Sequence, residues 1–341
     1  MAGVKPRVAV LFNEPAPVSG RGPDPDLSDV GVLQEVEDVE AALGSRGCGV
    51  ERVAVGRGSL FPAVADLARR RAETLVFNLC EGIGGEARFE PLVAGLLELE
   101  GIRFTGSPAA TLTCALDKRV AKALLFAAGI PTPGARVYRS VPKVPSVRDL
   151  TFPLVVKPLR EDGSIGISAE AFVRTPEALV ERVDHVLRTF RQPALAEVYL
   201  EGREFNVSVI GVSRQARVLP VAEIVFEGYG DGEPRIVTHE AKWREGSADD
   251  RRTVPRCPAA IGENLRARLE TVALAAHRAL ECRDYARYDL RLDARGAPQV
   301  IDVNPNPDLS RKAGLARSVA ASGDTYEDLV ARIAEWAWAR S

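Results

Sequence analysis

The sequence predicts an α/β fold in the N-terminal half of the chain and an α+β fold in the C-terminal half. Short apolar runs alternate with helical segments over residues 7–99, which is typical of a parallel sheet covered by helices. Closer to the C-terminus, residues 287–304 form two strand-like runs joined by a turn, which predicts an antiparallel hairpin. A chain of 341 residues is long for one hydrophobic core, so we expect two or three domains.

Three strands and three helices account for the N-terminal part. The expected strands are 7–12, 50–55 and 74–79, and the expected helices are 30–43, 62–71 and 89–99. A loop rich in Pro, Gly and Asp follows the first strand, and a glycine-rich loop, 78–86, follows the third. Ligands bind beyond the carboxyl ends of parallel strands, so the second loop is a candidate substrate wall, and a plain turn is an equal alternative. Pro108 marks an expected domain boundary.

The segment around Lys157 carries the first functional signal. Residues 152–157 form an apolar strand that ends at this lysine, and a buried ammonium group needs an anion. The loop that follows, 160–168, is rich in glycine, and its backbone amides can wrap phosphates although it matches neither a Walker loop nor GxGxxG. An earlier helix, 116–126, has Lys118 near its start, where a lysine considered alone is more often a surface residue.

A strand, a short polar break and a second strand follow a helix at 176–190. The first strand covers 194–200, and the second opens at Glu204. Main-chain groups of residues 197–200 can face an adenine ring in this arrangement. An ordinary charged connection is the alternative, and composition alone favours it.

The segment before the hairpin combines a strand, a polar loop and a long helix. A strand is expected at 219–226, and Lys242 precedes a polar loop over 244–256. We expect that loop to lack regular structure and to act as a lid. The remaining expected helices are 259–280 and two that begin near Leu315 and Tyr326.

The hairpin register brings charged side chains together. Opposed residues in a hairpin have positions that add up to a constant. The expected pairs are Leu292 with Gln299, Asp289 with Asp302, and Arg287 with Asn304. Because side chains alternate along a strand, the last two pairs share one face.

The facing carboxylates of Asp289 and Asp302 predict a metal site. Two carboxylates about 5 Å apart destabilise a sheet unless a positive charge lies between them. A solvated polar face explains Arg291 and Asp293, but it does not explain a face of an otherwise apolar strand. Two carboxylates and the amide oxygen of Asn304 are hard oxygen ligands of the kind that Mg²⁺ takes, often together with phosphate oxygens. The sequence therefore predicts a magnesium–nucleotide site.

Composition excludes several classes of protein. The net charge is −2 with the signs interspersed, so we expect neither nucleic acid nor an anionic membrane as a partner. The five cysteines are scattered without a CxxC pair, which favours a reduced, cytoplasmic protein with no zinc site. The sequence has only three histidines, which argues against a histidine-based nucleophilic triad. No apolar run reaches membrane-spanning length, and we expect no signal peptide.

Taken in order, the motifs resemble the ATP-grasp superfamily, and specifically the D-alanine–D-alanine ligase family. The resemblance runs from residue 74 to the C-terminus, and several ordered matches are far more specific than any one of them. The matching motifs are Gly84-Gly85-Glu86, Thr105-Gly106-Ser107, Asp117-Lys118, Lys157-Pro158 with Gly163-Ser164-x-Gly166, and Asp302-x-Asn304. The resemblance implies an ATP-grasp fold with an N-terminal α/β domain at 1–108 and two domains, 109–203 and 204–341, that clasp ATP.

The resemblance also implies a role for individual residues. Those implied to bind ATP are Lys118, Lys157, Glu197, Val198, Leu200, Glu204 and Lys242. Asp289, Asp302 and Asn304 would hold two Mg²⁺ ions, with Mn²⁺ as an alternative, and Asp302 is a shorter equivalent of the glutamate usual in the family. Arg287, Lys242 and Ser164 would be catalytic, with Arg287 stabilising the oxyanion that develops at the attacked carbonyl.

The substrate pocket departs from the family pattern. Gly163 stands where the family has a serine, Trp243 where it has a tyrosine, and Glu81 where it has a histidine. Asp308 replaces a glycine, and Ala313 takes the place of a serine that binds a carboxylate; a helix N-cap is the alternative role for Asp308. We therefore expect amino-acid-like substrates other than D-alanine. The expected substrate contacts are Glu81, Glu14, Asp308 and Ser310.

These observations predict an ATP-dependent ligase that joins a small-molecule carboxylate to an amine. ATP would phosphorylate the carboxylate, the amine would attack the acyl phosphate, and ADP and phosphate would be released. A homodimer is compatible with this function. One alternative is an ATP-grasp enzyme acting on a peptide or protein carboxylate, which an open loop at 13–29 would admit. Others are a nucleotide-binding regulatory protein and a structural α/β protein, and the facing carboxylates disfavour the last.

Overall fold

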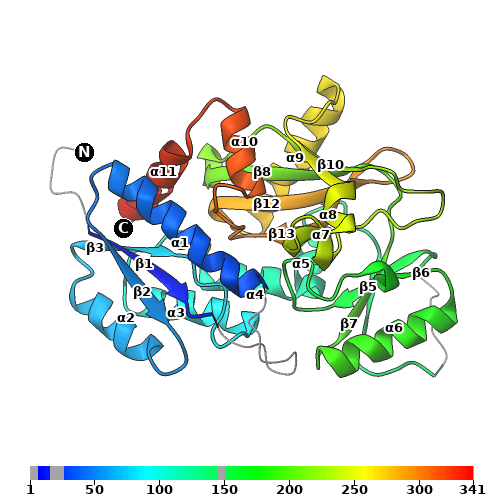
Figure 1. The fold of residues 1–341 in the computed structure, drawn as a ribbon, viewed down its shortest axis with the longest axis horizontal. Coiled ribbons are helices and arrows are strands. Elements are labelled where there is room, and N and C mark those ends of the chain that lie inside the picture. Colours follow the sequence, from blue (N-terminus) through cyan, green and yellow to red (C-terminus); the bar gives the residue numbers. More distant parts are fainter. Residues whose placement is uncertain (1–6, 16–26, 144–149, 341) are drawn as a thin grey trace.

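The computed structural model describes residues 7–15, 27–143 and 150–340. Three sheets follow one another in chain order and lie in separate parts of the molecule (Figure 1). Most of the predicted open loop, residues 16–26, lies outside the described residues. The chain thus has mixed α/β architecture, as predicted from its sequence.

The N-terminal sheet is parallel and covered by helices on both faces. It consists of β1 (Arg7–Asn13), β2 (Val50–Val55) and β3 (Thr74–Asn78) in the order β2-β1-β3. The side chains of β1 alternate between two hydrophobic clusters. One cluster joins the sheet to α1 (Leu27–Ser45) and α11 (Tyr326–Ala339). The other joins it to α2 (Leu60–Arg69) and α3 (Glu90–Leu99), which follows a short 3₁₀ turn, η1 (Ala87–Phe89).

The central sheet is antiparallel, with the order β4-β7-β5-β6. Its strands are β4 (Ala135–Tyr138), β5 (Leu154–Pro158), β6 (Phe172–Val173) and β7 (Ala194–Val198), with a 3₁₀ turn, η2 (Ala169–Ala171), before β6. The amphipathic helix α6 (Pro176–Thr189) buries Leu179, Val183 and Val186 against this sheet. Figure 1 shows α6 and this sheet at the opposite end of the molecule from β1–β3.

Two helices connect the first sheet to the second, where the sequence predicted one. Besides α5 (Lys118–Ala127), the structure has α4 (Ala109–Leu116). Asp117 separates them because its carboxylate accepts hydrogen bonds from the backbone N–H groups of Arg119 and Val120, at 3.2 and 3.3 Å, and so caps a new helix.

The C-terminal sheet carries the hairpin at its edge, in the order β11-β10-β8-β12-β13. Its strands are β8 (Glu204–Val212), β10 (Ala222–Phe226), β11 (Thr253–Arg256), β12 (Arg283–Leu292) and β13 (Pro298–Asn304), and the short β9 (Arg217–Val218) also pairs with β8 after a 3₁₀ turn, η3 (Ser213–Gln215). Helix α9 (Glu263–Ala279) packs on one face of this sheet. After the hairpin come α10 (Gly314–Ala321) and then α11, which returns to the N-terminal sheet.

The prediction that residues 244–256 lack regular structure is wrong. Helix α8 (Ala248–Arg252) and strand β11 lie within this range, directly after α7 (His239–Trp243). Thr238 and Ser247 cap the two short helices by accepting hydrogen bonds from Ala241 and Asp250, and β11 pairs with β10. Each element is too short to give a periodic signal in the sequence.

The hairpin register agrees with the prediction at the acidic pairs and differs at the turn. Asp289 is opposite Asp302 and Arg287 is opposite Asn304, but Leu292 is opposite Pro298, not Gln299. The shift arises at a β-bulge after Asp289, where Ile301 is the additional residue.

The division into domains at residues 108 and 203 stays a proposal. One sheet lies in each of the three ranges, whereas α11, in the last range, packs on the first sheet.

Candidate active site

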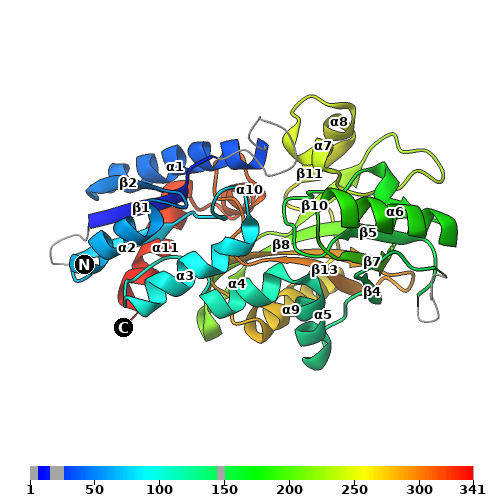
Figure 2. The ribbon, with the colours of Figure 1, turned by 90° about the horizontal axis from the view of Figure 1, so that it is seen from below.

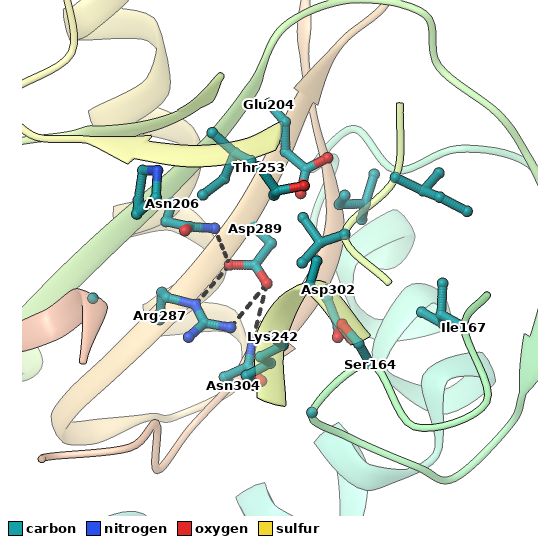
Figure 3. A pocket seen from close by; sticks show the side chains of 18 of the residues that line it. Ser164, Ile167, Glu204, Asn206, Lys242, Thr253, Arg287, Asp289, Asp302 and Asn304 are labelled. Atoms are coloured by element: carbon teal, nitrogen blue, oxygen red, sulfur yellow. Dashed lines mark hydrogen bonds and ion pairs between the residues drawn. The ribbon is translucent and has the colours of Figure 1, made fainter. Parts of the chain in front are cut away.

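The polar face of the hairpin forms a compact charged cluster around Asp289. Arg287 donates two hydrogen bonds to its carboxylate, from Nε to Oδ1 at 2.8 Å and from Nη2 to Oδ2 at 3.0 Å. Asn206 on β8 donates to Oδ1 at 2.8 Å, and Asn304 donates to Oδ2 at 3.4 Å. These side chains point toward one another in Figure 3. The guanidinium group supplies the positive charge that two facing carboxylates require.

Lys118 is buried, although a lysine at a helix start is more often a surface residue. Only 6% of its side chain is exposed, and its ammonium lies 3.2 Å from both Asp162 and Asp302. Burial alone would lower the pKa of Lys118, but the two carboxylates raise it above the usual value, so the lysine stays charged. Burial alone would also raise the pKa of Asp302, but Lys118 and Lys157 hold it below the usual range.

A second buried ion cluster forms around Glu197. Lys157 lies near the end of β5, and its Nζ lies 3.3 Å from Oε1 of Glu197 and 3.4 Å from the carbonyl oxygen of Ile301. Lys122 on α5 pairs with the other carboxylate oxygen of Glu197. Burial alone would raise the pKa of Glu197, but Lys122 and Lys157 together lower it. The bulged residue Ile301 therefore has a local role, because its carbonyl receives a hydrogen bond from a buried ammonium group.

Glu204 is buried at the start of β8 and faces Arg291 at 3.5 Å. Burial raises the pKa of Glu204 to about 7. The positive charge of Arg291 acts to lower this pKa, and the negative charge of Asp289 acts to raise it further. The guanidinium of Arg291 is shared: it also donates to the carbonyl of Arg235 at 2.7 Å, and it stacks on the ring of Tyr199, 4.7 Å from the centroid. Glu204 is thus an acceptor whose charge depends on pH near neutrality.

We expect the stability of the protein to report the titration of Glu204. The folded protein binds this proton more tightly than the unfolded chain does, so the free energy of unfolding falls as pH rises from 4.5 to about 7. Glu204→Gln should remove about 3 kcal/mol of this pH dependence, measured by urea unfolding at several pH values. The exposed Glu201, replaced by Gln, serves as the control. Parallel curves for wild type and Glu204→Gln would contradict the assignment.

A large cavity, of about 630 Å³, collects most of the predicted site residues. Those that line it are Lys157, Ser164, Glu197, Val198, Leu200, Glu204, Lys242, Arg287, Asp289, Asp302, Asn304, Asp308 and Ser310. Lys118 does not line it, because Asp162 and Asp302 cover its ammonium group. Loss of hydration and the charge of Arg287 lower the pKa of Lys242 at the mouth of this cavity. Figure 3 shows Ser164, Lys242 and the hairpin residues around the same space.

A smaller cavity, of about 150 Å³, adjoins the large one through Lys242, Arg287 and Asn304. Glu81 lines only the smaller cavity, and Asp308 lines both. The backbone N–H of Glu81 donates to the side-chain oxygen of Asn13, at 3.0 Å, which fixes the start of the glycine-rich loop.

Glu14 lines neither cavity, although its neighbour Asn13 lines the smaller one. Its carboxylate approaches Gly56 at the end of β2, where a Cβ would lie 2.9 Å from Oε2. The prediction that Glu14 contacts the substrate is therefore not supported by its position. The helix N-cap interpretation of Asp308 is wrong as well: α10 begins at Gly314, and the carboxylate of Asp308 accepts instead from the N–H of Ser310 at 2.7 Å.

The hairpin residues fit a divalent ion that arrives with phosphate. The carboxylates of Asp289 and Asp302 and the amide of Asn304 share one face and line one cavity, and oxygen donors of this kind suit Mg²⁺. In the described residues no group of three or more acidic, histidine or cysteine side chains is gathered for a metal. Two carboxylates and an amide leave coordination positions for phosphate oxygens.

Comparison with known proteins decides the family. A family model described as the C-terminus of D-ala D-ala ligase matches residues 138–335. The D-alanine--D-alanine ligase of Ralstonia pickettii is 30% identical over 93% of this chain and 88% of its own length. The chain belongs to the D-alanine–D-alanine ligase family. An uncharacterized protein, y4sG of Sinorhizobium fredii, is 37% identical over 76% of this chain and 73% of its own length.

A solved structure shows the same fold. The D-alanine--D-alanine ligase from Bacillus anthracis, complexed with ATP, has a TM-score of 0.74 and covers 98% of this chain and 97% of its own. Its sequence identity of 22% makes this a likeness of fold. Membership of the ligase family makes the chain an ATP-grasp ligase and implies the use of ATP and a divalent metal. In the described part of this ligase, none of the helices has the length and apolar character needed to span a bilayer.

The sequence analysis did not identify three polar residues that belong to the ligase site or pair with its side chains. Lys122 lies four residues after Lys118, one turn along α5, and this spacing was an available signal. Asn206 lies two residues after Glu204 and therefore on the same face of β8. Asp162 gave no signal, because its contact with Lys118 depends on how the glycine loop folds back over α5.

Proposed function

We propose that the protein is an ATP-dependent carboxylate–amine ligase that forms an amide bond through an acyl phosphate, on amino-acid-like substrates other than D-alanine. The observation that carries the proposal is the hairpin face: Arg287, Asp289, Asp302 and Asn304 line one large cavity that Lys157 and Lys242 also line. Family membership supports ATP-dependent ligation in general. The composition of the smaller cavity supports a different substrate.

The large cavity would hold the nucleotide. Its walls run from residues 197–200, whose main chain would meet adenine, past Glu204, which would accept hydrogen bonds from the ribose. Lys157 and Lys242 would contact the phosphates, and Lys118 would join them once Asp162 moves aside. Two Mg²⁺ ions, held by Asp289, Asp302, Asn304 and phosphate oxygens, would neutralise the triphosphate charge.

The reaction would need positioning and electrostatics, with no nucleophilic side chain. A carboxylate oxygen of the first substrate would attack the γ-phosphorus, and the bond to ADP would break. The amine nitrogen of the second substrate would then attack the acyl carbon, forming the C–N bond as the C–O bond to phosphate breaks and the amine loses a proton. Arg287 would stabilise the oxyanion at the acyl carbon, and the N–H groups of the glycine loop near Ser164 would orient the transferred phosphoryl group.

A panel assay tests this proposal. ADP release would be measured with Mg²⁺ and ATP over pairs of amino acids and dipeptides, including D-alanine with itself. We expect release that depends on one pair other than D-alanine with D-alanine. Turnover with D-alanine pairs as the best substrates would contradict the substrate part of the proposal. ATP binding without turnover on any pair would favour the alternatives, a peptide or protein substrate or a regulatory nucleotide-binding protein.

The acidic side chains of the smaller cavity predict recognition of a positive group. Glu81 and Asp308 both line it, next to Lys242. We expect Asp308→Asn to lower kcat/KM by about tenfold for amines that carry an amino or guanidino side chain, relative to neutral amines. An amide still accepts the hydrogen bond from Ser310, so this variant removes only the charge. Asp308→Ala should give the same change in selectivity. If the ratio of kcat/KM for charged over neutral amines stays at the wild-type value, Asp308 does not recognise a positive group.

A further inference from the structure

Trp243, the last residue of α7, contacts two glycines from distant segments. Its indole N–H donates a hydrogen bond to the carbonyl oxygen of Gly163 at 2.8 Å. A Cβ on Gly163 would lie 3.4 Å from Cζ2 of the ring, and a Cβ on Gly31 in α1 would lie 3.4 Å from Cζ3. The ring therefore lies against two stretches of backbone that have no side chains, and it joins α1, the glycine loop and α7. Figure 2 shows α7 close to one end of α1.

The two glycines beside the ring differ in what requires them. Gly31 lies in the first half of α1, where glycine stabilises a helix less than alanine does. A methyl group at position 31 would meet the ring of Trp243 at 3.4 Å, an ordinary van der Waals distance, so the ring lies directly against α1 at this point. Gly163 has a φ of +62°, a conformation that side-chain-bearing residues rarely adopt.

Helix α7 is tied to the glycine loop at a second point. The backbone N–H of His239, at the start of α7, donates to the carbonyl of Ile167 at 2.9 Å. At the other end of the helix, Trp243 donates its hydrogen bond to Gly163. These two hydrogen bonds attach both ends of α7 to the glycine loop, and we call this attachment the clasp. Thr238, which caps α7, also donates to Asp249 at 2.7 Å and joins α8 to the same unit.

The clasp places Lys242 between the two cavities. The ammonium of Lys242 lies 5.0 Å from the centroid of the Trp243 ring, within range of a cation–π contact. Both residues line the large cavity and the small one. The same ring therefore positions the lysine and forms part of the wall of the smaller cavity.

We propose that Trp243 is a positioning and size-limiting residue: it clasps α7 onto the glycine loop, aims Lys242 into the site, and restricts the smaller cavity to small substrates. The size limit rests on the proposed function, in which that cavity holds a substrate. The clasp itself rests only on the contacts of Trp243 with Gly31 and Gly163.

Backbone hydrogen exchange tests the clasp without any substrate. Trp243→Phe keeps an aromatic ring but loses the N–H donor, and we expect exchange at 163–168 and 239–243 to rise by about fivefold, as the loss of one hydrogen bond implies. Exchange in the hairpin, 283–304, should stay unchanged. The matched control is Trp338→Phe on α11, where the ring contacts Arg103 away from the cavities. Equal exchange in wild type and Trp243→Phe, or an equal rise in Trp338→Phe, would overturn the clasp.

Substrate size tests the second part. In Trp243→Ala the smaller cavity loses a wall, so the ratio of kcat/KM for bulky over small side chains should rise at least tenfold, while the KM for ATP changes less. A ratio that stays at the wild-type value in a folded, ATP-binding variant would overturn the size limit. Absence of turnover in wild type on every pair would count against the proposed function and against the size limit, and the exchange result would decide the clasp alone.

Discussion

Asp302→Asn is expected to reduce ATP- and Mg²⁺-dependent ADP release by about a thousandfold. Asp302 faces Asp289 across the hairpin, and its pKa is held low by lysines, so it is a carboxylate at neutral pH. An amide has the same shape but lacks the negative charge that a divalent ion requires. The measurement is the initial rate of ADP release at saturating ATP, over a range of Mg²⁺ concentrations.

A matched variant separates loss of charge from loss of the hairpin. Asp293 lies in the turn of the same hairpin and accepts hydrogen bonds from the N–H groups of Arg295 and Ala297 at 2.9 and 2.7 Å. Asp293→Asn makes the same chemical change on the exposed turn, and its rate should stay within about twofold of wild type. Comparable loss in the two variants would show that the hairpin, not a metal ligand, was damaged. Full activity in Asp302→Asn would show that Asp302 is not a metal ligand.

Glu197→Ala is expected to lower the free energy of unfolding by about 3–5 kcal/mol. The variant leaves the ammonium groups of Lys122 and Lys157 buried side by side without the carboxylate that neutralises both. Glu197→Gln keeps the shape and one acceptor, so it should be less damaging than alanine. The effect is measured by urea unfolding of the two variants. The control is Glu201→Ala, because Glu201 is exposed.

The pH dependence of this effect has a definite sign. The pKa of Glu197 is lower in the folded protein than its usual value of 4.5, so its stabilisation is complete above that pH. It is lost as pH falls through the folded-state pKa, where the carboxylate becomes protonated. The difference in stability between wild type and Glu197→Gln should therefore narrow below pH 4.5. A difference that is constant down to pH 3, or an alanine variant as stable as wild type, would contradict the ion cluster.

Local sequence patterns predicted the hairpin face because a strand repeats every two residues. Asp289, Asp302, Arg287 and Asn304 fall on one face for any hairpin whose register is right at those positions. The bulge at Ile301 could not be predicted, since it depends on the packing of β13 against neighbours such as Pro131, whose carbonyl accepts from the N–H of Val300 at 2.9 Å. The parallel N-terminal sheet was equally accessible, because its buried strands are short apolar runs separated by helical segments.

The rest of the site depends on contacts between distant segments. Lys122 and Asp162 look like ordinary surface residues until the fold brings them to Glu197 and Lys118. The direction of the Glu14 side chain likewise depends on a distant segment, because its carboxylate lies next to Gly56, the residue after β2. The short helices of the polar segment 239–252 are fixed by single caps and by one strand pairing, and periodicity does not detect them.

The most direct test of the central claim is the fate of a carboxylate oxygen. Once the panel assay has identified a substrate pair, its carboxylate component is labelled with ¹⁸O and turned over with ATP and Mg²⁺. Transfer through an acyl phosphate predicts one labelled oxygen in each inorganic phosphate released, together with ADP, since the attacking oxygen leaves with phosphorus. Unlabelled phosphate, or AMP and pyrophosphate as products, would contradict the acyl-phosphate mechanism.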